Sequence, residues 1–75
     1  MTTYKILMSE TTIKEGIEIE VITILKTVNY RDNPIMSAHY EMTINGNPVG
    51  SDEMNSKQVD WYKENYKEYI NKETN

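Results

Sequence analysis

Acidic side chains are the most numerous groups in this chain that could do chemistry. Glu18 and Glu20 are two residues apart in an alternating apolar and polar stretch, so their carboxylates should leave one strand face about 7 Å apart. Glu41 is expected on a neighbouring strand, and Glu10 and Glu15 complete the acidic zone. The separation approximates phosphate spacing along one nucleic-acid strand, so this zone could occupy a basic groove on another protein. The alternative is a solvated sheet face whose charge only maintains solubility.

Two carboxylates at a defined separation can also hydrolyse glycosides. That chemistry needs a concave pocket that desolvates one of the acids, and a chain of 75 residues seldom encloses one. The sequence also contains no glycine-rich phosphate loop and no Ser, His and Asp arrangement for nucleophilic catalysis. We therefore expect no enzymatic activity and no catalytic residues.

Metal and cofactor binding have little support in the sequence. The chain contains one histidine and no cysteine, which excludes a thiolate zinc site and a disulfide framework. His39 and Glu41 would share a strand face, but two ligands make a poor metal site. We expect no metal and no cofactor, and we expect His39 to be an ordinary surface or half-buried residue.

Trp61 is the largest side chain that could anchor a partner. On a helix with about 100° per residue it lies on the polar side, together with Asn65 and Glu68. An exposed indole is a natural anchor at a protein interface, because aromatic residues are enriched at binding hot spots. In the alternative, the helix packs across a wider surface, or the turn around residues 49–54 covers the indole.

Apolar residues before residue 50 follow a period of two, which is typical of strands. The predicted strands are residues 3–13, 17–28, 35–44 and a short segment, 47–50. Asn45–Gly46 favours a tight hairpin turn, and polar residues 14–16 and 29–34 are expected to form the other turns. Pro48 restricts the last strand to an edge of the sheet.

The alternation also predicts which side chains share a face. The first strand should direct Tyr4, Ile6 and Met8 to one side. In the second strand the parity breaks at Val21 and Ile22, so this strand either is buried on both faces or contains a bulge there. One face of the third strand should carry Met36, Ala38, Tyr40, Met42 and Ile44.

After residue 50 the period becomes helical. Asn55 and Gln58 form a capping pair that predicts a helix over residues 56–72. The apolar stripe expected to face the sheet consists of Val59, Tyr62, Tyr66, Tyr69 and Ile70. The whole pattern predicts one α+β domain, residues 1–75, in which an antiparallel meander of three long strands and a short edge strand carries one C-terminal amphipathic helix on one face.

Size and charge restrict the possible partners. Seventy-five residues form a small core without disulfide or metal support, so we expect a homodimer. The formal net charge of -4 disfavours direct nucleic-acid binding, and no apolar stretch is long enough for a secretory signal or a membrane span. A meander followed by a helix resembles small βββα nucleic-acid-binding domains, but those expose basic residues where Glu18, Glu20 and Glu41 are expected here.

Composition gives one further indication. A short, acidic, motif-free chain rich in Ile, Lys, Asn, Glu and Tyr resembles accessory proteins of bacteriophages and mobile elements, including inhibitors of host defence systems. That resemblance implies a cytoplasmic protein in a bacterial host that inhibits a host enzyme or complex by stoichiometric binding. The alternative is a structural, self-assembling protein with no catalytic role.

Overall fold

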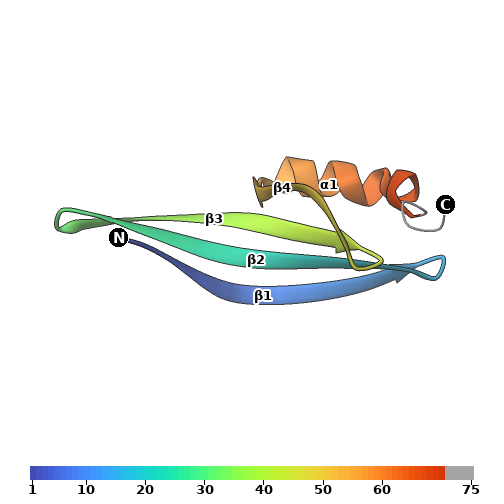
Figure 1. Ribbon diagram of the computed structural model, residues 1–75, viewed down its shortest axis with the longest axis horizontal. Helices are drawn as coiled ribbons and strands as arrows, with labels where there is room; N and C mark the ends of the chain where they lie inside the picture. Colours follow the sequence, from blue (N-terminus) through green and yellow to red (C-terminus); the bar gives the residue numbers. More distant parts are fainter. Residues whose placement is uncertain (71–75) are drawn as a thin grey trace.

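A computed structural model describes residues 1–70 as a four-stranded antiparallel sheet followed by two short helical segments (Figure 1). The elements are β1 (Thr2–Lys14), β2 (Ile17–Tyr30), β3 (Asn33–Ile44), β4 (Asn47–Met54), α1 (Ser56–Glu64) and the 3₁₀ helix η1 (Tyr66–Tyr69). The strand order β1-β2-β3-β4 is that of a meander. The predicted α+β class and antiparallel meander are confirmed.

A two-residue turn connects the strands in each of the three hairpins, and backbone geometry explains the turn sequences. Asn45 (φ 51°) and Gly46 (φ 80°) both have the positive φ that the Asn–Gly signal predicted. The second turn is shorter than expected, because β2 continues to Tyr30 and β3 begins at Asn33. Pro34 pairs with Asn29, whose backbone N–H donates to Met1 O at the first strand and not to β3. This pair therefore needs no N–H from the proline, and Pro34 fits within β3.

β4 extends to Met54, so the prediction that it ends near residue 50 is wrong. Its pairing with β3 skips from Met42–Val49 to Tyr40–Met54, and residues 50–53 form a bulge. Gly50 begins this bulge with a φ of 73°, a conformation that suits glycine. The strand can therefore pair again at its end before it leads into α1.

β1 carries a bulge, although a bulge was expected only for the second strand and only as one of two alternatives. Ile6 pairs with Ile24 and Met8 pairs with Thr23, so Leu7 is an extra residue between them. Consequently Tyr4 and Ile6 share one face and Met8 lies on the other, which contradicts the predicted common face.

β2 itself pairs with β3 without interruption, so the bulge predicted near Val21 and Ile22 is wrong. The other alternative holds in part. Ile17, Ile19 and Val21 are buried on the face toward α1, and Ile24 is buried on the opposite face.

The core lies at one end of an elongated molecule. Ile19, Ile44 and Met54 are its most buried side chains, and Val59 of α1 packs against the same cluster. α1 packs on β3 and β4, and the β2–β3 hairpin projects well beyond it (Figure 1). The principal extents are 50 × 21 × 18 Å, so one short helix covers only part of the sheet.

β1 is exposed along its whole length, although its alternation of apolar and polar residues is typical of a strand with one buried face. Its apolar side chains Tyr4, Ile6, Leu7, Met8 and Ile13 are each more than half exposed. The reason is that α1 packs on β3 and β4, at the other end of the strand order from β1. A strand with an apolar pattern therefore remains at an uncovered edge.

The helical segment begins as predicted but ends early. The Asn55 side chain accepts from the Gln58 amide at 2.9 Å, and the Gln58 side chain accepts from the Asn55 amide at 2.8 Å. At Asn65 the α-helix stops, and the side-chain amide of Asn65 donates to Trp61 O. The predicted helix over 56–72 is therefore a nine-residue α-helix and a 3₁₀ turn, and residues 71 and 72 lie outside the described residues.

Candidate functional site

Five carboxylates gather on the face of the sheet opposite α1. Glu18 and Glu20 of β2 and Glu41 of β3 alternate with the buried residues of their strands, which places all three on this side. Asp52 and Glu53 of the β4 bulge line the same surface next to Glu41. We call these five residues the acidic face.

Among the ion pairs formed within residues 1–70, Glu53 is the one member of the acidic face that takes part. Lys26 Nζ lies 2.9 Å from Glu53 Oε1, and this hydrogen bond lowers the pKa of Glu53 and raises that of Lys26. Glu20 accepts a hydrogen bond from Ser9 at 3.3 Å. Glu18 and Glu41 form no ion pair with the described residues, so their charge is available to an external cation.

His39 is buried beside the acidic face, with only 7% of its surface exposed, which corrects the expected surface or half-buried position. The ring of Tyr4 lies edge-on to it at 6.2 Å, and Glu53 approaches from β4. Within residues 1–70 His39 Nδ1 has no hydrogen-bond partner, because Glu53 Oε1 is 3.9 Å away. A buried polar atom without a partner is costly and calls for an explanation.

An open hollow adjoins His39. Its volume is about 640 Å³, and its walls combine the apolar side chains of Tyr4, Ile6 and Ile24 with three carboxylates of the acidic face, those of Glu41, Asp52 and Glu53. A lysine or arginine side chain suits this chemistry, because its methylenes match the apolar wall and its N–H groups can donate to carboxylates.

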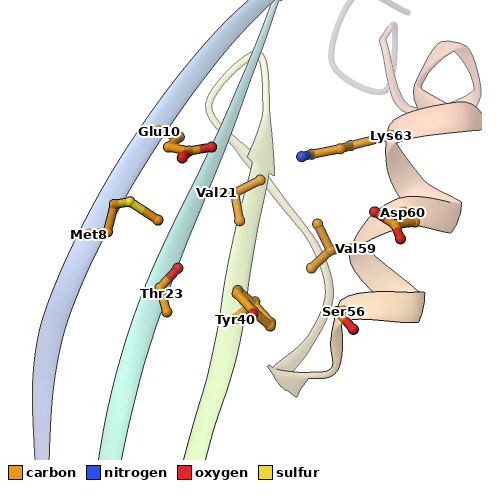
Figure 2. A pocket seen from close by; sticks show the side chains of 9 residues that line it. All are labelled: Met8, Glu10, Val21, Thr23, Tyr40, Ser56, Val59, Asp60 and Lys63. Atoms are coloured by element: carbon orange, nitrogen blue, oxygen red, sulfur yellow. The ribbon is translucent and has the colours of Figure 1, made fainter.

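A second depression, the helix–sheet groove, lies on the other face (Figure 2). Its volume is about 180 Å³, and Val21, Tyr40 and Val59 contribute to its walls. Figure 2 shows Glu10 of β1 and Lys63 of α1 extending toward each other across it. Glu10 therefore lies apart from the acidic face, contrary to the grouping in the sequence analysis.

Glu15 also lies apart from the acidic face. It accepts a hydrogen bond from Tyr66 Oη at 2.9 Å, and Lys67 Nζ lies 3.2 Å away. The Tyr66 hydrogen bond, followed by Lys67, lowers the pKa of Glu15. This carboxylate therefore fixes η1 to the first turn and belongs to the fold.

Trp61 is 48% exposed, so the indole is partly open to solvent. Its ring contacts Tyr62 edge-on, with centroids 5.0 Å apart. Glu68 is exposed on η1, and Asn65 is partly buried where it caps α1. These three residues lie on the helical segments, so the structure separates them from the acidic face by the thickness of the sheet.

Sequence reasoning missed Asp52, Glu53 and Tyr4 as neighbours of His39. Asp52 and Glu53 were hidden by the assumption that β4 ended near residue 50. The available signal was Met54, an apolar residue that ends a polar run and returns the strand to the core. Tyr4 was assigned correctly to a strand, but the bulge at Leu7 sets its face.

Comparisons with protein-family models, with curated proteins and with solved structures found no significant match to the chain. Within residues 1–70 no group of three His, Asp or Glu side chains is arranged to hold a metal ion. Neither helical segment of the described chain combines the length and apolar character required to cross a bilayer. The candidate site therefore rests on its own geometry.

Proposed function

We propose that this protein acts by stoichiometric binding to another protein and that the acidic face is its binding surface. The partner presents lysine or arginine side chains, of which one enters the hollow beside His39. We further propose that the partner is a host enzyme or complex in the bacterial cytoplasm, which the protein inhibits by occupying a basic groove.

The observation that carries this proposal is the hollow beside His39, whose walls combine apolar side chains with the carboxylates of Glu41, Asp52 and Glu53. A cationic side chain in the hollow would meet these carboxylates while its methylenes contact the apolar wall. The remaining charges of the acidic face would raise the association rate with a basic surface.

The experiment compares proteins captured from a bacterial lysate by three immobilised variants. The parent and a control, Asp32→Lys with Glu64→Lys, should retain the same partner, because both substitutions lie away from the acidic face. Glu18→Lys with Glu20→Lys should lose it, although the change in net charge is identical. Binding should also weaken steeply with salt, because exposed charges more than about 8 Å apart are largely screened at physiological ionic strength.

Trp61→Ala in the same experiment separates the two candidate surfaces. The proposal predicts that this variant retains the partner, since the indole lies on the other side of the sheet. Loss of the partner in Trp61→Ala with retention in Glu18→Lys and Glu20→Lys would transfer the function to the helical surface of Trp61, Asn65 and Glu68. Capture that is insensitive to both changes and to salt would contradict the acidic face as the site.

A further inference from the structure

The outer edge of β1 is the longest unpaired element of the described chain. β1 pairs only with β2, so the N–H and C=O groups on its other edge are free to pair with another strand. The opposite edge of the sheet is protected, because β4 contains Pro48 and a bulge. The two sheet edges therefore differ, and β1 is the one open to strand addition.

We propose that β1 pairs antiparallel with β1 of a second copy of this chain. The two-fold axis passes between Leu7 and Met8, so residue numbers of opposed side chains add to 15. Lys5 of each copy then lies opposite Glu10 of the other. This pairing goes beyond the proposed partner binding and does not depend on it, because it uses the edge of the sheet.

The bulge at Leu7 is what permits this register. In a two-fold antiparallel pair, opposed residues must lie on the same face of the sheet. In a regular strand Lys5 and Glu10 would lie on opposite faces, because they are five residues apart. Here the extra residue shifts the alternation, and Lys5 opposes Leu25 while Glu10 opposes Val21, two β2 positions on the face toward α1.

Charge and apolar contacts select this register among its neighbours. With a sum of 15, both charged side chains in the middle of β1 have an opposite charge across the pair, and Leu7 meets Met8. In the neighbouring register, whose opposed residue numbers add to 13, the charged Lys5 would face the apolar Met8. In the register with a sum of 17, the charged Glu10 would face the apolar Leu7. Within residues 1–70 neither Lys5 nor Glu10 has an intramolecular ion pair that would compete.

Lys5 and the bulge would otherwise protect this edge in a lone chain, as such features commonly do. In the proposed dimer the same two features become complementary to a second copy. Pairing would also cover part of the apolar surface of Ile6, Leu7 and Met8, which are 65%, 51% and 51% exposed. That burial supplies the additional apolar surface that so small a core lacks.

The second copy would complete the helix–sheet groove. Glu10 lines this groove (Figure 2). In the proposed register, Lys5 of the second copy would stand next to Glu10. Because the axis is perpendicular to the sheet, both acidic faces would point the same way and both α1 helices the other way. The dimer would therefore offer two acidic faces to one partner surface, which raises the apparent affinity through bivalency.

A charge swap tests the register, with dimer dissociation measured by sedimentation. Lys5→Glu and Glu10→Lys should each raise the dissociation constant about tenfold, because two attractive pairs become repulsive. The double variant should return to the parent value. An equimolar mixture of the single variants should form a heterodimer. Glu10→Lys also reduces the net negative charge, so its weakening could not come from overall repulsion.

Cysteine cross-linking provides an independent measurement, because the chain has no native cysteine. Lys5→Cys with Glu10→Cys should form a covalent dimer under mild oxidation, since opposed Cβ atoms are close enough for a disulfide. Lys5→Cys with Lys14→Cys, which the register keeps apart, should remain uncross-linked. Equal cross-linking of both variants, or charge variants that dimerise as well as the parent, would overturn the proposal. Partner capture by the acidic face could still succeed in that case, so the two proposals fail separately.

Discussion

At the scale of single residues, position on the sheet decides what an apolar side chain contributes. Ile44 is fully buried beneath α1, whereas Ile35 on the projecting hairpin is 60% exposed. We predict that Ile44→Ala lowers the free energy of unfolding by about 3 kcal/mol, because it removes core contacts and leaves a cavity. Ile35→Ala should cost about 1 kcal/mol or less, the scale of strand preference alone. Urea denaturation at one protein concentration measures both, and equal losses would contradict the described core.

Residue identities predicted some of this arrangement and not the rest. Ile17, Ile19 and Val21 alternate with other residues in the pattern typical of a strand with one buried face, and all three are buried. The burial of His39 was not predictable from its strand, because its cover comes from Tyr4 and from Glu53, which are distant in sequence. Such tertiary contacts leave no periodic signal.

At the scale of elements, Gly50 controls the path from β4 to α1. A Cβ at this position would meet Met54 Sδ and would lie 3.0 Å from the Tyr62 ring, and the φ of 73° would be strained. We predict that Gly50→Ala lowers the free energy of unfolding by about 2 kcal/mol or more. Gly46→Ala should cost about 1 kcal/mol, since it has a similar φ but open space around it. A larger loss in Gly46→Ala would contradict the described bulge.

The contact between η1 and the first turn should depend on pH. Hydrogen bonding from Tyr66, together with Lys67, lowers the pKa of Glu15 below its ordinary value of 4.5. A lowered folded-state pKa contributes stability that is present above the ordinary value and is lost as the pH falls through the lowered one. NMR signals of Tyr66 and Lys67 should therefore shift in that acidic range. Glu15→Gln should remove this transition, whereas Glu64→Gln should leave it unchanged; a transition that survives Glu15→Gln would contradict the assignment.

Local signals predicted the beginnings of elements better than their ends. The Asn55–Gln58 capping box and the Asn45–Gly46 turn are formed by residues adjacent in sequence, and both appear as predicted. α1 ends early because Asn65 bonds back to Trp61 O and the chain then turns toward Glu15. That change of direction depends on a contact 51 residues away, which helical periodicity does not encode.

At the scale of the whole molecule, one short helix covers part of a sheet whose longest dimension is 50 Å. The sequence predicted the sheet, the start of the helix and the common face of Glu18, Glu20 and Glu41, but it did not predict that β1 would remain uncovered along its length. The missing information was the position of α1 across the sheet, which follows from the β4 bulge. The uncovered edge and the acidic face are together the surfaces on which the proposed interactions depend.

The most direct test of this account is the mass of the unmodified protein by sedimentation equilibrium from micromolar to millimolar concentration. Pairing through β1 predicts that the mass approaches twice the 8.8 kDa of one chain as the concentration rises. A species that remains at 8.8 kDa up to the highest concentration would contradict the proposed interface.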